Sequence, residues 1–327
     1  MIRRRDAEDG AMSESLRIDT HIHLYSSPQE GEWWKAGYEI WEYGQRDGVD
    51  FSQDTGTLGE TVAALGRGGF AHGVVMNLFS ADLFRLQYES ALPPEADTAE
   101  RARALAQFDA TIGERYVAFN RWLMDTLADA PTISGFVAMD PWVLTPERNV
   151  EHLREMAGRG ARGVKLHPVV QKFEANDPRM HPVYQACIEL GLTVLSHTGP
   201  ARGGEPFAEV PAFAPMLREF PALNVVLAHL GGGKWQETPA IAQAFPNVAF
   251  DLSEIIEWTG APNAPTAREL ATLIRDIGPD RVVLGSDYPW YEPARTAELV
   301  LALPDLSPAE KNAILGENAA RILGLPV

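Results

Sequence analysis

Short apolar runs alternate with amphipathic stretches along most of the chain. Eight of these runs predict buried strands, at residues 16–22, 73–79, 133–139, 162–166, 192–196, 224–228, 248–252 and 281–286. Several are continuously apolar, as expected when helices cover both faces of a sheet. Helix-period patterns lie between them, for example at residues 149–158 and 267–277. Strands that alternate with helices indicate parallel βα units, and eight such units predict an α/β fold, the (β/α)₈ TIM barrel.

Two stretches interrupt this alternation, one after the first strand and one after the second. The first contains Trp33, Trp34, Tyr38, Trp41 and Tyr43, and the second contains Phe79, Phe84, Tyr88, Tyr116, Phe119 and Trp122. Both follow the carboxyl-terminal ends of strands, where barrel enzymes carry their active sites. We therefore predict helical, aromatic insertions that cover a site and help to form a substrate pocket. The alternative is that these aromatic rings only pack the inserted helices onto the barrel.

The two ends of the chain differ in character. Residues 307–310 read Ser-Pro-Ala-Glu, a capping box with proline at the first helical position, and predict a helix that runs to about residue 323. Residues 1–15 combine arginines with acidic residues and have no apolar segment of the signal-peptide kind. We interpret residues 1–15 as a flexible leader and residues 16–327 as one barrel domain.

Composition limits the partners that the protein can have. The chain has 327 residues, with 28 Lys and Arg against 45 Asp and Glu, which gives a net charge of −17. This charge argues against nucleic acid or an anionic membrane as a partner and favours a small-molecule substrate. No apolar run reaches the roughly 20 residues that cross a bilayer, so we expect a cytoplasmic protein. Its oligomeric state is open, with a homo-oligomer as one alternative.

Polar side chains with metal-binding chemistry lie at the ends of five predicted strands. They are His21, His23, Lys165, His167, His197, His229 and Asp287. His21 and His23 are two positions apart on a strand, so they leave the same face and can bind one ion together. Imidazole nitrogens and a carboxylate suit a divalent metal; zinc is favoured, as one ion or two, with manganese or iron as alternatives. Such an ion lowers the pKa of bound water to about 7 and makes hydroxide available.

Further polar residues follow the later strands. Glu254, just after the seventh strand, is a candidate for a metal ligand or for a residue that orients one. Arg202, Lys234 and Trp235 follow the fifth and sixth strands and are candidates for substrate binding. Arginine suits a carboxylate because its planar fork can bind both oxygens. We therefore expect Arg202 to anchor an anionic group of the substrate.

Six segments together resemble one family. They are IDTHIH at 18–23, GVKLHP at 163–168, LSHTG at 195–199, LAHLGG at 227–232, LGSDYP at 284–289 and ILGENAAR at 314–321. In this order they resemble the amidohydrolase superfamily. The branch that they resemble most is the amidohydrolase-related group that includes aminocarboxymuconate-semialdehyde and γ-resorcylate decarboxylases. The resemblance covers residues 18–325 and implies a metal-dependent TIM barrel.

The resemblance also implies a role for each matching position. His21, His23, His197 and Asp287 would bind the metal, and Asp287 would also move protons. His229 would bind a second ion in members with two metals and would act as acid, base or electrophile in members with one.

The fourth strand leaves two alternatives open. A carboxylated Lys165 could bridge two ions, as the resemblance implies for hydrolases with two metals. His167 lies two residues further along and shares the same face of the strand, so it competes for this role.

Three reactions are compatible with these residues. Hydrolysis of an amide, ester or lactone bond by metal-activated water is favoured slightly, because Lys165 would complete a site with two metals. Nonoxidative decarboxylation of an aromatic or unsaturated acid is supported by the aromatic insertions and by the branch that the sequence resembles. Oxygen chemistry at a dinuclear iron or manganese centre is the third alternative, for which His167 and Glu254 would supply extra ligands.

Overall fold

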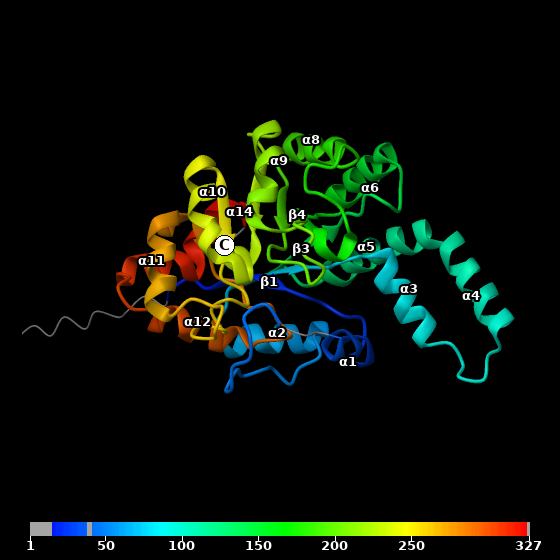
Figure 1. Ribbon diagram of the computed structural model, residues 1–327, viewed down its shortest axis with the longest axis horizontal. Helices are drawn as coiled ribbons and strands as arrows, with labels where there is room; N and C mark the ends of the chain where they lie inside the picture. Colours follow the sequence, from blue (N-terminus) through cyan, green and yellow to red (C-terminus); the bar gives the residue numbers. More distant parts are fainter. Residues whose placement is uncertain (1–14, 38–40, 326–327) are drawn as a thin grey trace, which may run out of the picture.

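The computed structural model describes residues 15–37 and 41–325. Its centre is a sheet of eight parallel strands in the order β1 to β8 (Figure 1). The strands are β1 (Ile18–Ile22), β2 (His72–Met76), β3 (Ile133–Ala138), β4 (Gly163–Leu166), β5 (Thr193–Ser196), β6 (Asn224–Leu227), β7 (Val248–Asp251) and β8 (Val282–Val283). The predicted barrel is confirmed, and β8 is shorter than the predicted strand because the chain turns after it into the site described below.

Hydrogen bonds between the first and last strands bring the two edges of the sheet together. The backbone N–H of Thr20 donates to Leu284 O at 3.0 Å, His23 N donates to Tyr288 O at 2.7 Å, and Asp287 N donates to His21 O at 2.9 Å. These bonds place the ends of β1 and of the segment after β8 at the same rim. Side chains that are far apart in the sequence are therefore neighbours there.

Helices surround the sheet or extend from it. They are α1 (Pro28–Ala36), α2 (Leu58–Arg67), α3 (Ala81–Ser90), α4 (Thr98–Ala110), α5 (Ile112–Leu127), α6 (Pro146–Gly158), α7 (Pro168–Gln171), α8 (His181–Leu190), α9 (Ala214–Glu219), α10 (Thr238–Ala244), α11 (Ala267–Ile277), α12 (Pro293–Ala302), α13 (Pro308–Asn312) and α14 (Asn318–Leu323). The prediction for α11 is confirmed residue for residue. The capping box at Ser307 is present, and one π-helical turn, Ala313–Glu317, joins α13 to α14 into the predicted final helix.

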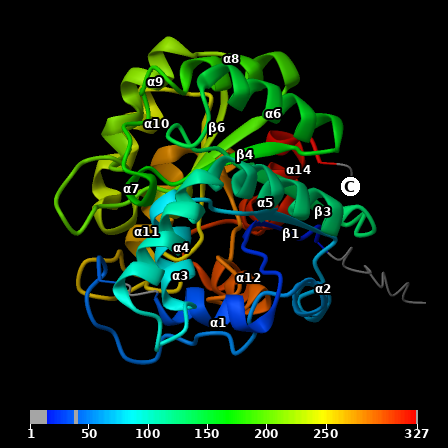
Figure 2. The ribbon, with the colours of Figure 1, turned by 90° about the vertical axis from the view of Figure 1, so that its right-hand side faces the viewer.

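The predicted insertions are confirmed as α1 with its following loop, and as α3 with α4. Helices α3 and α4 project from the barrel in Figure 1, and Figure 2 shows them in front of it, with α1 beneath. The Trp34 ring of α1 meets the Phe84 ring of α3 edge to face, with 6.2 Å between ring centroids. The two insertions therefore touch each other, although they leave the barrel after different strands. Tyr38 of the first insertion lies outside the described residues.

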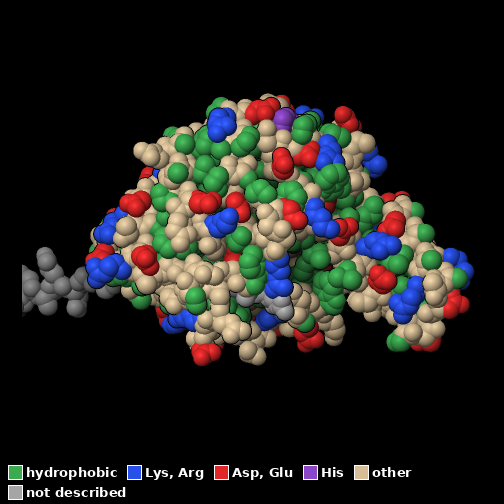
Figure 3. Space-filling view, in the orientation of Figure 1, with side chains coloured by type: hydrophobic (Ala, Val, Ile, Leu, Met, Phe, Trp, Pro, Cys, Tyr) green, Lys and Arg blue, Asp and Glu red, His purple; other side chains and the backbone are tan. Residues whose placement is uncertain are grey.

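Three further features concern the length of the helices, the charges on the surface and the amino-terminal end. Within the described ranges, no helix is both long enough and apolar enough to span a bilayer. Figure 3 shows acidic and basic side chains interspersed over one face of the molecule. The proposed leader falls outside the described residues except for Ser15.

Candidate active site

A cavity of about 550 Å³ lies at the carboxyl-terminal ends of the strands. Its polar lining comprises His23, Lys165, His167, His197, His229, Glu254 and Asp287. We call these residues, with the fully buried His21 next to them, the floor. The apolar lining includes Trp33, Trp34, Leu78, Leu83, Leu86, Val170 and Trp290, which we call the wall. The volume lies within the usual range for small-molecule sites, and the barrel brings together every polar residue singled out at the predicted strand ends.

Asp251, the last residue of β7, fixes the orientation of His21. Its Oδ2 lies 2.9 Å from His21 Nδ1. Because a carboxylate only accepts, Nδ1 donates this bond and Nε2 keeps a lone pair on the other side of the ring. Burial lowers the pKa of His21 to about 4, and the positive charge of Lys165 adds to this effect. The imidazole is therefore neutral near pH 7, which is the form that binds metal.

His229 is held by a similar set of bonds in an unusual backbone conformation. His229 and Leu230 have φ of 62° and 49°, in the left-handed region where a residue other than glycine is strained by about 1–3 kcal/mol. The other oxygen of Asp251, Oδ1, accepts a hydrogen bond from His229 N at 2.9 Å. His229 Nδ1 donates to Ser253 O at 3.0 Å, so Nε2 is the ring nitrogen left for the site. The strained turn is fixed by bonds at both the backbone and the ring.

Asp287 provides the negative charge of the floor. Its backbone has φ of 63°, and its Oδ1 lies 3.2 Å from His23 Nε2 and 3.5 Å from His21 Nε2. Burial alone would raise the pKa of Asp287, but the hydrogen bond from His23 and the neighbouring imidazoles lower it below its usual value. Asp287 is therefore ionised at neutral pH.

The Lys165 side chain extends from β4 to the His21 ring. Its Nζ lies 3.0 Å from His21 Nε2, and the side chain is almost fully buried. Burial lowers the pKa of Lys165 to about 8, although Asp287 and Asp251 oppose this shift. Part of the amine is therefore neutral just above pH 7, and only the neutral amine can be carboxylated.

His167 and His197 form a stacked pair on the other side of the floor. Their ring centroids are 3.9 Å apart, and the His197 ring meets the His229 ring at 4.9 Å. Burial lowers the pKa of both His167 and His197 well below the usual histidine value. Among the described residues, no hydrogen-bond partner is found for the buried Nδ1 of His167. Both fourth-strand candidates thus face the cavity: Lys165 contacts His21, and His167 contacts His197.

Glu254 adds a second carboxylate to the floor. It has φ of 65° and is 4% exposed. Its side chain hydrogen-bonds with that of Glu42, which follows α1 in the first insertion. Glu42 Oε2 also accepts a bond from Gly233 N at 3.2 Å. This contact joins the insertion to the loop that carries His229.

The donor atoms of the floor fit a divalent ion. In each of three triplets, one donor atom from every residue lies within 4.8 Å of the others: His21, His23 and Asp287; His21, His229 and Asp251; and His229, Glu254 and Asp287. The first and third place imidazoles beside carboxylates, the ligand set of zinc and similar metals. His197 belongs to none of these triplets, and its ring centroid lies 4.9 Å from that of His229.

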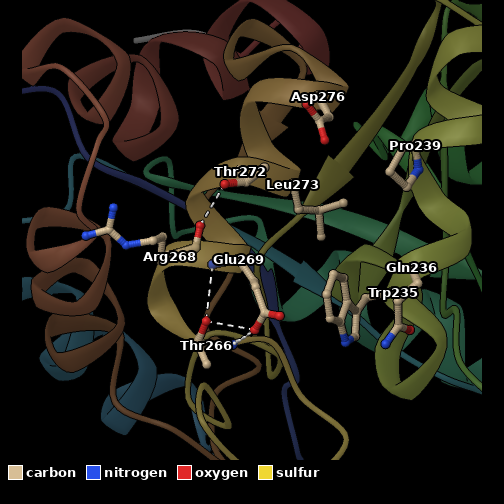
Figure 4. Close-up of a pocket in the computed structure, with 9 residues that line it drawn as sticks. All are labelled: Trp235, Gln236, Pro239, Thr266, Arg268, Glu269, Thr272, Leu273 and Asp276. Carbon is tan, nitrogen blue, oxygen red and sulfur yellow. Dashed lines mark hydrogen bonds between the residues drawn. The ribbon is translucent and has the colours of Figure 1, made fainter.

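The three residues predicted to bind substrate lie away from the cavity lining. The Arg202 guanidinium carbon lies 5.9 Å from the ring centroid of Trp41, and Lys234 Nζ is 2.7 Å from Glu209 Oε1. Trp235 lines a separate surface depression of about 530 Å³ beside α11, shown in Figure 4. Although Arg202, Lys234 and Trp235 follow strands, their side chains do not lie over the floor.

Two residues of the site carry no prediction from the sequence. Asp251 ends β7 after three apolar residues. A carboxylate at the end of a barrel strand is a recognisable signal of an active-site residue. Glu42 lies in an irregular segment, and nothing in the local pattern indicates that it reaches Glu254.

An eight-stranded barrel with imidazoles, a lysine and carboxylates at its strand ends defines a class of metal-dependent barrel enzymes. The chain belongs to the amidohydrolase family, whose model matches residues 18–325. It is therefore an enzyme of the amidohydrolase superfamily, as the sequence motifs indicate.

Two curated proteins resemble parts of the chain. One is 2-amino-3-carboxymuconate-6-semialdehyde decarboxylase from Dictyostelium discoideum, 24% identical over 55% of this chain and 58% of that protein. The other is 4-sulfomuconolactone hydrolase from Hydrogenophaga intermedia, 26% identical over 55% of this chain and 63% of that protein. The chain matches less than two thirds of the length of either relative. One relative is a decarboxylase and the other a hydrolase, so they do not decide between these reactions.

Solved structures share the fold at low sequence identity. A TIM-barrel protein from Bordetella bronchiseptica has a TM-score of 0.65 at 20% identity, over 95% of this chain and 99% of that one. The 5-carboxyvanillate decarboxylase of Sphingomonas paucimobilis has a TM-score of 0.60 at 17% identity, over 95% and 100%. The 2,6-dihydroxybenzoate decarboxylase from Rhizobium has a TM-score of 0.62 at 16% identity, over 95% and 99%. At these identities the likeness establishes the barrel alone.

Proposed function

We propose that the protein is a metal-dependent hydrolase of an ester, lactone or amide bond in a small organic molecule. The observation that carries this proposal is Asp287, an ionised carboxylate 3.2 Å from His23 Nε2 at the floor of the cavity. A carboxylate in this position can accept a proton from attacking water. His21, His23 and Asp287 would hold the ion, which supplies polarisation of the carbonyl and a lowered pKa of bound water.

The other floor residues have assignable tasks in this reaction. His229 Nε2 is the ring nitrogen opposite the Nδ1 that donates to Ser253 O. It is suited to exchange a proton with the carbonyl oxygen or with the leaving group. Asp287, after taking a proton from water, can return it to the departing oxygen or nitrogen. The bond from water oxygen to the acyl carbon forms, the bond to the leaving group breaks, and the protons balance.

The test separates hydrolysis from decarboxylation by isotope. Protein loaded with Zn²⁺ or Mn²⁺ is incubated in ¹⁸O-water with 3,4-dihydrocoumarin, a neutral lactone, and in parallel with 2,6-dihydroxybenzoate. Hydrolysis places one ¹⁸O in the carboxylate of the opened lactone, which mass spectrometry detects. Release of CO₂ from the acid, without opening of lactones or esters, would overturn the proposal.

Decarboxylation of an aromatic or unsaturated acid is the second candidate. Lys165 in the cavity lining favours it, because an ammonium can pair with a substrate carboxylate. The resemblance to a curated decarboxylase supports it as well. Metal content, measured by plasma mass spectrometry, bears on the third candidate: two irons per chain, or iron with manganese, would favour oxygen chemistry.

A further inference from the structure

We propose that Glu42, which follows α1 in the first insertion, is a positioning residue of the active site. Its carboxyl group holds the Glu254 side chain toward the cavity, where Glu254 becomes a further oxygen ligand of the metal ion held by Asp287. The inference rests on the metal-dependent floor of the proposed function, and it applies to hydrolysis and to decarboxylation alike. Its supports are the contacts of the Glu42 backbone, the space around the Glu42 side chain and the conformation of Glu254.

The backbone of the insertion is fixed on the loop after β7 independently of the Glu42 side chain. Asn263 Nδ2 donates to Glu42 O at 3.0 Å, and Asn263 N donates to Tyr43 O at 3.0 Å. The buried Tyr43 ring stacks on the Trp258 ring with 5.8 Å between ring centroids. Because none of these contacts uses the Glu42 carboxyl group, a substitution can remove this group and leave the insertion in place.

Three glycines leave room for the Glu42 carboxyl group. A Cβ atom at Gly199 or Gly232 would lie 2.8 Å from Glu42 Oε2, and one at Gly233 would lie 2.9 Å from Glu42 O. Real Cβ atoms stay more than 3.0 Å from such neighbours, so a side chain at any of these positions would displace Glu42. Gly233 N also donates to Glu42 Oε2 at 3.2 Å. The carboxyl group therefore occupies a space that the loops after β5 and β6 leave open.

Glu42 stands behind Glu254 as seen from the cavity. The two side chains are hydrogen-bonded, and Glu254 belongs to the cavity lining whereas Glu42 does not. A carboxylate only accepts, so one of the two groups carries the proton of this bond. Since a carboxyl group has two oxygens, one oxygen of Glu254 is left for the cavity. A residue that orients a metal ligand without touching the metal has this arrangement.

The backbone of Glu254 makes such support necessary. Its φ of 65° lies in the left-handed region, which a residue other than glycine keeps only where its surroundings fix it. One donor atom each from His229, Glu254 and Asp287 lies within 4.8 Å of the others. Asp287 also belongs to the triplet with the two histidines of the first strand, so an ion bound there has Glu254 as a neighbour. Loss of the Glu42 carboxyl group should therefore lower metal affinity.

Calorimetric titration of the metal-free protein with Zn²⁺ tests the proposal without a substrate. Glu42→Ala should weaken Zn²⁺ binding by about tenfold or more, since loss of an orienting residue costs about 10- to 100-fold. Glu42→Gln keeps a group that can donate and accept, so it should restore most of the affinity. Glu32→Ala, at an exposed carboxylate of α1, is the control and should bind Zn²⁺ normally. Equal losses in Glu42→Ala and Glu42→Gln, or no loss in either, would overturn the proposal.

A double-mutant cycle separates positioning from general damage to the fold. Glu254→Ala should weaken Zn²⁺ binding at least as much as Glu42→Ala does. If Glu42 acts through Glu254, adding Glu42→Ala to Glu254→Ala should have little further effect, because the two losses are not additive. Fully additive losses, or normal Zn²⁺ affinity in Glu254→Ala, would show that Glu42 does not position a metal ligand.

This proposal and the hydrolase function fail separately, because no lactone enters the titration. The expected order of Zn²⁺ affinities without opening of 3,4-dihydrocoumarin would remove the hydrolase function and keep the role of Glu42. Opening of 3,4-dihydrocoumarin by variants that all bind Zn²⁺ alike would keep the function and remove the role of Glu42.

Discussion

The floor and the wall of the cavity are built in different ways. Floor residues stand at strand ends, and their rings and carboxylates are fixed by buried hydrogen bonds, as for His21 and His229 on Asp251. Of the wall residues, Trp33, Trp34, Leu83 and Leu86 stand on the inserted helices. Helix α3 has no fully buried residue, and ring packing and exposed ion pairs are among its contacts. Chemistry thus rests on the rigid barrel, whereas the surface that selects a substrate rests on parts that can change at little cost to the fold.

The largest expected effect comes from removing a ligand of the floor. His23→Ala should lower metal affinity by more than about 100-fold, because the loss of a residue that only orients a metal ligand can already cost that much. Activity should disappear with the metal. Plasma mass spectrometry after dialysis, alongside the lactone assay, measures both. Thermal unfolding of the metal-free proteins serves as the control. Full metal content and activity in this variant would rule out the His21–His23–Asp287 site.

Next in size is the loss of the proton acceptor. Asp287→Asn keeps an oxygen that can bind metal but cannot accept the proton, so kcat should fall by about 10²- to 10⁴-fold while metal content is largely kept. Stopped-flow or steady-state assays of lactone opening measure kcat. An unchanged kcat would assign the base to another residue, and His229→Asn would then be the variant to examine.

A smaller effect is expected at the wall. Trp34→Ala removes the stack on Tyr25 and the edge contact with Phe84. The KM for an aromatic lactone should rise about tenfold with kcat nearly unchanged, since the floor is intact. Trp41→Ala is the control, because Trp41 is a 41% exposed tryptophan of the same insertion that lies outside the cavity lining. A fall in kcat alone would mean that floor and wall are not separable.

The smallest effect concerns the attachment of the wall to the barrel. The Asp140 carboxylate after β3 accepts hydrogen bonds from Trp142 N and from Ala81 N, the first residue of α3. Burial raises the pKa of Asp140 from 3.8 to about 6. Between these pH values the folded protein therefore binds one proton more than the unfolded chain. The resulting contribution to the free energy of unfolding is complete below pH 3.8 and is lost as the pH rises through 6.

Asp140→Asn should remove this pH dependence. The difference in unfolding free energy between pH 5 and pH 8 should shrink by about 1–2 kcal/mol relative to the unaltered protein, as measured by urea unfolding at the two pH values. Asp109→Asn, at a side chain that is 52% exposed on α4 and pairs with Arg85 of α3, is the control. An identical pH dependence in all three proteins would mean that Asp140 stays charged or protonated throughout.

The sequence was sufficient for the barrel because its strands are apolar runs of the right length between capped helices. Residues 267–277 form α11 as expected, since the Thr266–Glu269 capping box marks its beginning. The predicted eighth strand was too long. Residues after Val283 leave the regular ladder because Asp287 turns into the cavity with φ of 63°, and a strand pattern does not encode such a turn.

The floor was predictable and the substrate contacts were not. Strand-end residues converge in any closed barrel, so His21, Lys165 and His229 could be placed together before the structure was known. Contacts made by loops depend on where the loop folds back. Glu42 reaches Glu254 for this reason, and Lys234 instead pairs with Glu209 on the outside.

Asp251 has an evolutionary consequence. One of its oxygens serves the His21 ring and the other serves the His229 backbone. A substitution there disturbs two candidate ligands at once, so a descendant of this chain cannot readily alter one without the other. The helices around the cavity mouth are under no such joint constraint. Divergence along this lineage should therefore change which molecules are accepted long before it changes what is done to them.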